Sequence, residues 1–330
     1  MGHWKHCIAR AGIGVAAILA TSSAAAETIQ TRGVYAANID LPADIQLITI
    51  ERFRGDLGQD VELALTHVLG SVLIRSEPYF DLITPGVLQK AVVEVEGQDG
   101  TITSRPLVAD ADMRGTVRSE EIERDVEPRI DRECIARDKD GDCTERREIR
   151  IQCRELSVRV DPRILLIASD GLQVYSYSTS QTRSERYCAD DGSIPSSLGM
   201  ANDLVDQIVV NIRRDLAPTE SVRNIRVMER RRDIRREDRD AFRDAVRATQ
   251  SDVGAACAGF MALEGANPTN VSLLFNIGLC FESTADLNDA ENYYRRALEL
   301  DPGRDYPTRG LRRVNSRMRA EANLAARGSY

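Results

Sequence analysis

The chain has 330 residues, of which 42% are hydrophobic and 29% are charged, and its formal net charge at neutral pH is -8. This acidic balance disfavours nucleic acid as a partner, because proteins that bind nucleic acid present a basic surface. Without the N-terminal segment described next, about 300 residues remain, a length that suits two domains.

Residues 1–26 are predicted to be a secretory signal peptide. A basic segment ends at Arg10, an apolar stretch covers residues 11–20, and three alanines precede Glu27. This succession is typical of a signal peptide that is cleaved after Ala26. A membrane anchor is the alternative, but the apolar stretch is shorter than the roughly 20 residues that span a bilayer. We therefore expect a periplasmic protein that keeps no stable membrane span after cleavage.

Residues 27–228 are predicted to form an α+β domain. Apolar residues at helical spacing predict an amphipathic helix over about 59–75, and a second helix is expected over 197–216. The dipeptide Asp170-Gly171 predicts a hairpin turn between two long strands. Further strands are expected over residues 45–53, 79–84, 113–117 and 221–228, with a short helix at 85–91. The pattern indicates a mixed, mostly antiparallel sheet with packed helices.

The sequence pieces that carry this pattern are similar to a known type of envelope domain. They are DVELALTHVLGSVLIRSEPYFDLIT, in which a helix leads into a strand, then ADMRGTV, and LGMANDLVDQIVVNIRRDL followed by RNIRVM. In this order, residues 45–228 resemble the domain shared by the TolB amino-terminal region and the curli-secretion lipoprotein. They also resemble an outer-membrane lipoprotein that activates a penicillin-binding protein. The resemblance implies an envelope assembly or scaffold protein rather than an enzyme.

Residues 229–330 are predicted to be helical, beginning with a solvated charged helix over 229–250. The sequence NVSLLFNIGLCFESTADLNDAENYYRRALELDPG then has the spacing of a tetratricopeptide (TPR) helical hairpin. Small residues would lie where two helices cross, aromatic residues would fill the space between turns, and Pro302 would end the second helix. Ala256 and Phe260 lie 34 residues before their equivalents in this hairpin, which predicts a partial second repeat. The motif residues are Leu274, Ile277, Gly278, Phe281, Ala290, Tyr294, Ala297 and Pro302.

Six cysteines remain after cleavage, and an even number in an exported chain favours disulfides. One pair flanks the turn-rich ARDKDGD inside a charged insertion predicted over residues 118–150. A second pair lies at equal distances from the Asp170-Gly171 turn, and the third would join neighbouring helices. The predicted pairs are Cys134 with Cys143, Cys153 with Cys188, and Cys257 with Cys280. Zinc is the alternative, but the chain has no C-x-x-C pair and its mature part has a single histidine, His67.

The candidate catalytic and metal-binding residues have simpler interpretations. His67 lies alone beside the apolar stripe of its helix, without a nucleophile placed near it in sequence. Asp138, Asp140 and Asp142 resemble part of a calcium loop, because hard cations favour clustered carboxylates. The spacing does not satisfy the full EF-hand pattern, and a tight acidic turn explains these residues more simply. We therefore expect no cofactor and no metal.

The sequence predicts a non-catalytic scaffold or adaptor that binds a protein or peptide partner in the envelope of a Gram-negative bacterium, in envelope biogenesis or secretion. One alternative is an envelope enzyme that acts on glycans through carboxylates, although Glu120, Glu121 and Glu123 are more simply a solvated charge run. A calcium-stabilised structural module is the other. The partner is expected on the concave side of the helical region, where arginine offers fixed donors to an acidic peptide. The candidate binding residues are Arg243, Arg247, Leu274 and Asn276.

Overall fold

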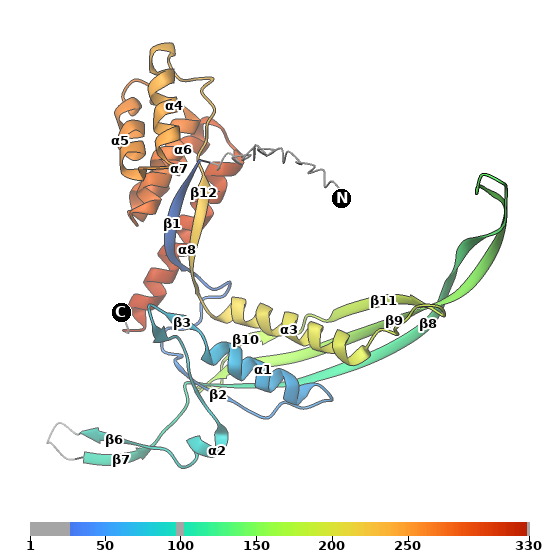
Figure 1. Cartoon of the computed structure of the whole chain (residues 1–330). Helices are drawn as coiled ribbons and strands as arrows, with labels where there is room; N and C mark the ends of the chain where they lie inside the picture. Colours follow the sequence, from blue (N-terminus) through green and yellow to red (C-terminus); the bar gives the residue numbers. More distant parts are fainter. Residues whose placement is uncertain (1–26, 97–101, 329–330) are drawn as a thin grey trace, which may run out of the picture.

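The computed structural model describes residues 27–96 and 102–328, so the predicted signal peptide (residues 1–26) lies outside the described residues. Figure 1 shows an α+β part that extends into a long curved hairpin, and a helical part that stands on one end of it. The predicted α+β class is confirmed, because a sheet with packed helices is followed along the chain by a region of helices.

One mixed sheet forms the centre of the α+β part. Its strands are β2 (Leu47–Ile50), β5 (Asp81–Ile83), β8 (Ala111–Arg137), β9 (Cys143–Ala168), β10 (Gln173–Tyr177) and β11 (Gln181–Cys188). The order across the sheet is β10, β9, β8, β2 and β5, and β11 follows β10 along the same edge of β9. β2 is parallel to both neighbours, whereas β8, β9, β10 and β11 pair in antiparallel fashion. This confirms the predicted mixed, mostly antiparallel sheet.

The turn between β9 and β10 forms at the predicted dipeptide. Gly171 has a φ of 88°, which the absence of a side chain allows. The carboxylate of Asp170 accepts a hydrogen bond from the Leu172 amide at 2.8 Å. The turn reverses the chain so that β10 and then β11 return along β9.

Two helices cover one face of the sheet, α1 (Gly58–Gly70) and α3 (Ser197–Leu216). The apolar stripe predicted for the first helix is buried, with Val61, Leu65 and Leu69 fully enclosed. α3 has the predicted bounds, and the Ser196 side chain caps it by accepting from the Gly199 amide. α1 ends five residues before the predicted boundary, because residues 73–78 pair as the strands of a small hairpin.

Two small hairpins and a short helix lie around this core. β3 (Leu73–Ile74) and β4 (Glu77–Pro78) form a small hairpin directly after α1. α2 (Pro85–Leu88) is a single turn with proline at its start, within the predicted short helix. β6 (Val92–Glu96) and β7 (Ile102–Pro106) form a second hairpin, which projects away from the helical part in Figure 1.

A separate two-stranded ribbon joins the two parts of the molecule. It pairs β1 (Thr28–Tyr35) with β12 (Thr219–Arg226). The strand predicted over 221–228 therefore exists, but it pairs with the N-terminal strand and not with the main sheet. The ribbon lies against α6 (Val271–Ser283) and α8 (Asp305–Ala326), as Figure 1 shows.

The helical part contains α4 (Arg239–Ala248), α5 (Val253–Glu264), α6, α7 (Leu287–Leu300) and α8, and each helix packs against the next. The helix predicted over 229–250 begins only at the 3-10 turn η1 (Arg236–Asp238), which leads into α4. The preceding residues do not form a helix because the backbone of Met228 is held by Asn276 and Ile234 is buried in the helical core.

Tyr294 lies at the centre of this helical packing, between Gly278 of α6 and Gly310 of α8. A Cβ at Gly278 would come within 2.8 Å of the Tyr294 ring, and one at Gly310 within 2.7 Å. The Tyr294 hydroxyl donates to Glu282 at 2.7 Å, and Arg313 of α8 donates to the same carboxylate at 2.6 Å. Burial and the charge of Glu282 raise the pKa of Tyr294 well above its ordinary value.

Candidate functional site: the hairpin arm

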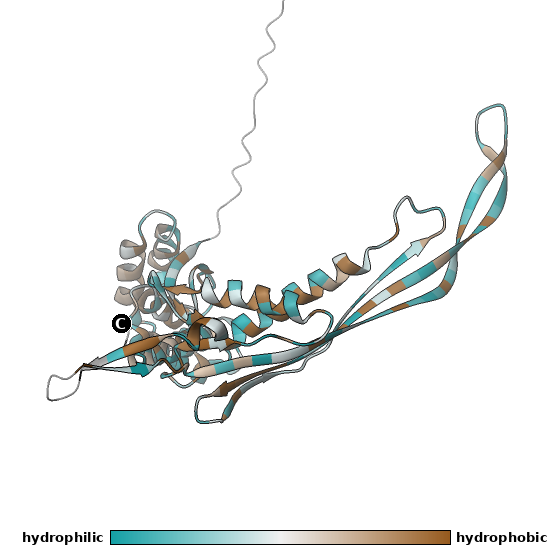
Figure 2. Ribbon diagram, turned by 90° about the horizontal axis from the view of Figure 1, so that it is seen from below, coloured by the Kyte–Doolittle hydropathy of each residue, from teal (hydrophilic) through white to brown (hydrophobic). Residues whose placement is uncertain are grey.

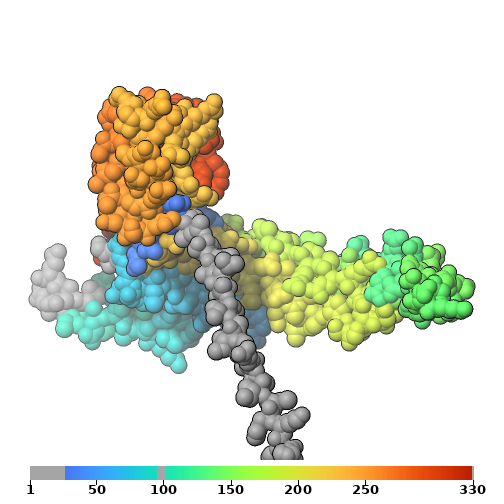
Figure 3. Space-filling model, turned by 45° about the horizontal axis from the view of Figure 1, so that its top comes forward, coloured from blue at the N-terminus to red at the C-terminus, as the bar shows by residue number. Residues whose placement is uncertain are grey.

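The β8–β9 hairpin continues far beyond the part of the sheet that the helices cover (Figure 1, Figure 3). β2 pairs with β8 at residues 111–113, and β11 ends where Cys188 lies opposite Cys153. Among the residues that the structure describes, residues 127–152 therefore form a ribbon of two strands and a turn, which we call the arm. The segment expected as an insertion, residues 118–150, overlaps most of it.

A disulfide and an acidic turn close the tip of the arm. Cys134 and Cys143 are bonded, as predicted. Between them, one carboxylate oxygen of Asp138 accepts hydrogen bonds from the amides of Asp140 and Asp142, at 3.0 and 2.8 Å. The three candidate calcium ligands thus form a tight turn. No cluster of three or more His, Cys, Asp or Glu side chains suited to a metal ion occurs within residues 27–96 and 102–328.

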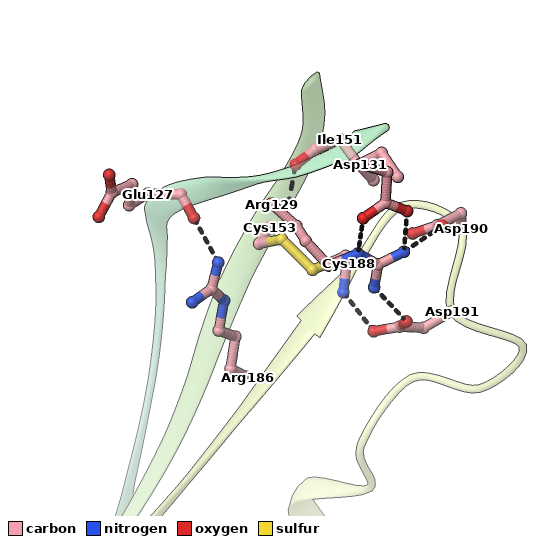
Figure 4. A network of polar contacts seen from close by, with 9 residues as sticks. All are labelled: Glu127, Arg129, Asp131, Ile151, Cys153, Arg186, Cys188, Asp190 and Asp191. Carbon is pink, nitrogen blue, oxygen red and sulfur yellow. Dashed lines mark hydrogen bonds and ion pairs between the residues drawn. A yellow bond between two sulfur atoms is a disulfide. The ribbon is translucent and has the colours of Figure 1, made fainter. Parts of the chain in front are cut away.

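A second disulfide fastens the root of the arm to the main sheet. Cys153 of β9 and Cys188 of β11 face each other in the strand register and are bonded, as predicted, and both are buried. Figure 4 shows the bond among polar contacts that link β8 with β11 and with the residues that follow β11. Arg186 of β11 donates to the backbone oxygen of Glu127 at 2.6 Å, so the root of the arm is joined to β11 from both strands of the arm.

Arg129 reinforces this root through carboxylates on two segments. Its guanidinium donates to Asp131 of the same strand at 3.1 Å and to Asp191 beyond β11 at 3.3 Å, and it also contacts Asp190 (Figure 4). Hydrogen bonding to Asp131 and the nearby charge of Asp190 raise the pKa of Arg129 above its ordinary value. The register shifts just before Arg129, next to Pro128, as expected where a proline lacks the amide that a regular ladder needs.

The faces of the arm combine neutralised charges with exposed isoleucines. Arg147 donates to Glu133 at 2.8 Å and Arg132 to Glu148 at 3.4 Å, in both cases across the two strands. Such exposed pairs contribute about 0–1 kcal/mol each. The apolar side chains stay accessible: Ile130, Ile135 and Ile149 are 50%, 48% and 36% exposed. Figure 2 shows this mixture of polar and apolar residues along the arm.

The two edges of the arm are free beyond its root. At the root, the carbonyls of Glu127 and Gln152 accept from Arg186 and from the Ala189 amide. Among the residues described, neither strand of residues 128–151 pairs with a third strand, so each edge presents backbone N–H and C=O groups to solvent. An unpaired edge is a template for adding a strand from another chain. An isolated two-stranded ribbon is marginally stable in water, and here disulfides at tip and root hold it extended. The arm therefore offers both apolar side chains and backbone groups to a partner.

The structure places two of the four predicted binding residues in the protein interior. Leu274 and Asn276 are fully buried on α6. Asn276 donates to the Met228 carbonyl at 3.0 Å and accepts from the Met228 amide at 2.8 Å. The β1–β12 ribbon lies on this side of α6, and Ile29 of β1 enters the helical core. The chain's own strands thus occupy the surface on which a partner was expected.

The other two predicted binding residues lie on α4. Arg243 forms ion pairs with Asp240 at 3.1 Å and Asp244 at 3.7 Å, and Arg247 is exposed. These arginines lie on a different helix from Leu274 and Asn276.

Most residues of the predicted repeat motif are buried in the helical part. Leu274, Ile277, Ala290, Tyr294 and Ala297 are fully buried. Phe281 is partly buried and stacks on Tyr293, and Pro302 follows the end of α7. Cys257 and Cys280 join α5 to α6, so all three predicted disulfides are confirmed.

The remaining candidate residues are exposed. His67 lies on the outer side of α1, and Glu120 and Glu121 are solvent-accessible on β8. Glu123 accepts from Arg154 at 3.2 Å and from the hydroxyl of Tyr187.

The arm was not predicted as a continuous structure. The predicted strand 113–117 is the start of β8, which has 27 residues. Beyond residue 118 both faces are solvated, so the alternation of apolar and polar residues that identifies a strand fades. The sequence REIRIQCRELSVRV on β9 does alternate between apolar and polar residues. Pairing it with the residues before Cys134 would have predicted the longer hairpin.

Comparisons with known proteins give distant structural similarities. No protein-family model and no curated protein matches the sequence. One distant match is a protein from Helicobacter pylori named for its similarity to a neuraminyllactose-binding hemagglutinin, with 10% identity, TM-score 0.22, and coverage of 54% of this chain and 87% of that one. A second match is the PelC dodecamer from Paraburkholderia phytofirmans, with 14% identity, TM-score 0.21, and coverage of 56% of this chain and 97% of that one. A third match is a minor lipoprotein from Acinetobacter baumannii, with 9% identity, TM-score 0.23, and coverage of 54% of this chain and 98% of that one. Similarity at this level does not identify a function.

Among the described residues, none of the helices has the length and apolar character needed to cross a membrane.

Proposed function

We propose that this chain is a non-catalytic scaffold or adaptor of the periplasm, and that the arm carries its main contact with a partner protein. The observation that supports the proposal is a two-stranded ribbon with free edges and exposed isoleucines, held extended by disulfides. A segment of this kind contributes little to the core of its own domain. Its retention in an extended form is explained by a contact outside the chain.

Two further features enter the proposal. The three disulfides are typical of exported proteins, which supports a periplasmic location. The burial of Ala256 and Phe260, 34 residues before the equally buried Ala290 and Tyr294, supports tetratricopeptide-like packing in the helical part. We assign that helical part a structural role, because its α6 surface is covered by the β1–β12 ribbon.

The test is photocrosslinking in cells from a photoreactive residue at position 148 on the arm. The variant replaces Ile130, Ile135 and Ile149 by serine in one chain. We expect the yield of the main crosslinked protein to fall at least about tenfold, because loss of about 1.4 kcal/mol of contact energy already reduces affinity tenfold and each buried isoleucine contributes more than this.

The control replaces three exposed isoleucine or valine side chains outside the arm, Val87, Val108 and Ile194, by serine. The control should retain the crosslink, and both variants should melt within about 2 °C of the parent, since exposed substitutions change stability by about 0.5 kcal/mol or less. An undiminished crosslink in the arm variant, or an equal loss in the control, would contradict the proposal.

A further inference from the structure

The face of the main sheet that is turned away from α1 and α3 carries a hollow lined with arginine. Two adjoining cavities of about 690 and 820 Å³ share Thr116, Arg163 and Ser178, so they form one continuous depression. The position of this depression follows from strand alternation. On β9, Ile164 and Leu166 are buried beneath the helices, and the residues between and beside them face the other way. The arginines that line the hollow are Arg52, Arg54, Arg114, Arg118, Arg159 and Arg163.

The arginines that line the hollow outnumber its acidic residues. Glu51 and Asp161 are the acidic residues that line it. Arg159 donates to Asp161 at 3.0 Å. Among the described residues, the other five guanidinium groups form no ion pair within 4 Å, although the charge of Asp161 acts on Arg163 and that of Asp56 on Arg118. Like charges held in one concavity repel each other, and a bound anion relieves that repulsion. The local excess of positive charge contrasts with the net charge of -8 of the chain as a whole.

The spacing of the arginines indicates what kind of anion fits. Arg114 and Arg118 are separated by Thr116 on the same face of β8, and Arg159 and Arg163 are separated by Asp161 on β9. A strand advances about 3.3 Å per residue, so the two arginines of each pair lie about 13 Å apart along the strand. An extended peptide has the same rise, so carboxylates four positions apart in it match the spacing of each arginine pair.

Neutral polar groups in the hollow suit a peptide as well. Gln173 of β10 and the hydroxyls of Ser176, Ser178 and Ser180 line it together with Thr116. These groups can donate to and accept from the amides of an extended backbone. Arginine binds carboxylates with two parallel hydrogen bonds, which adds direction to the charge attraction.

We propose that this hollow binds an extended acidic peptide segment of a partner protein, with the guanidinium groups of Arg114 and Arg163 at its centre. The site lies on the part of the sheet whose opposite face is covered by α1 and α3, and it includes none of residues 127–152. This binding site is additional to the function proposed for the arm. Loss of binding here leaves the arm intact, so the two proposals fail independently.

The experiment measures fluorescence anisotropy of a labelled decapeptide of alternating glutamate and serine, titrated with the mature chain. The variant is the double substitution Arg114→Gln and Arg163→Gln, at two exposed side chains. We expect the dissociation constant to rise about 100-fold, or tenfold for each charge-assisted hydrogen-bonding group removed. The matched control, Arg132→Gln with Arg147→Gln on the arm, removes the same charge and should change the constant less than threefold. A peptide with glutamine in place of glutamate should not bind.

Several outcomes would overturn the proposal. They are absence of binding by the parent chain, an equal loss in the arm control, and equal binding of the glutamine peptide. Inorganic tripolyphosphate is titrated as a competitor, and a site that binds it while ignoring the glutamate peptide is an anion site of another kind. Circular dichroism checks that the variant is folded. If it is not, the pair Arg52→Gln with Arg54→Gln, on exposed residues after β2, replaces it and is held to the same expected loss.

Discussion

At the scale of single residues, the helical part depends on one aromatic ring held between two glycines. Tyr294 occupies the space that side chains at Gly278 and Gly310 would need. Its hydroxyl is satisfied by Glu282, whose buried charge is in turn paired with Arg313. A buried charge with an incomplete set of partners is costly, so each member of this group restricts its neighbours. Small residues are therefore required at two positions far apart in sequence.

The substitution Gly278→Leu tests this packing. We expect a loss of about 1–3 kcal/mol in the free energy of unfolding, because the ring of Tyr294 is confined on both sides and cannot move away from the new side chain. Urea denaturation followed by far-UV circular dichroism measures it. The control Gly265→Leu lies at the exposed end of α5 with no neighbouring atom within 4 Å and should be nearly neutral. Equal losses in both variants would show that helix propensity, and not the ring, is responsible.

At the scale of elements, the arm shows how a ribbon without its own core can persist. A hairpin of 27 and 26 residues buries little apolar surface once it leaves the helices. Disulfides substitute for the missing core by reducing the freedom of the open ribbon. The two disulfides lie in different surroundings. Cys134–Cys143 closes the solvated tip, whereas Cys153–Cys188 is buried beside the main core.

Removing the two disulfides separately should have different effects. Replacing Cys153 and Cys188 by serine should lower the global free energy of unfolding by about 2–4 kcal/mol, because this bond closes a long loop next to the core. Replacing Cys134 and Cys143 should leave global stability within about 0.5 kcal/mol and speed hydrogen exchange within the arm, where opening is local. Urea denaturation and hydrogen-exchange mass spectrometry measure the two effects. A global loss of equal size from the tip variant would show that the arm unfolds together with the core.

At the scale of the whole molecule, each of the two parts contributes residues to the core of the other. Ile29, near the start of the described chain, is buried in the helical core. Ala320 and Leu324, near its end, are buried in the core of the α+β part. Arg319 of α8 also donates to Asp40 at 2.6 Å. Because each core contains residues of an element that belongs to the other part, we expect the two to unfold together.

The substitution Leu324→Ala tests this coupling. The side chain is 1% exposed in the α+β core, and its truncation should cost about 2–5 kcal/mol. Hydrogen exchange should then accelerate in α6 as well as in β9. Leu300→Ala on α7, where the side chain is 44% exposed, should change stability by about 0.5 kcal/mol or less. Acceleration confined to the α+β part after Leu324→Ala would show that the two parts open independently.

The sequence was sufficient wherever a local pattern had a single physical solution. The Asp170-Gly171 turn, the apolar stripe of α1 and the length of α3 follow from short-range chemistry, and the structure contains them. Two disulfides also followed from the spacing of cysteines around turns, and the third from the expected packing of neighbouring helices. The α+β class came from the order of these elements.

Tertiary contacts decided the position of those elements whose sequence pattern is compatible with several neighbours. β12 could have joined the main sheet, but pairing with β1 places it against α6, where Asn276 holds Met228. That placement fills the surface expected for a partner, and no periodicity in the sequence encodes it. The arginine hollow likewise exists because separate strands bring Arg114 and Arg163 to one face. Local spacing determined the elements of this protein, whereas contacts between residues distant in sequence determined which of its surfaces remain open.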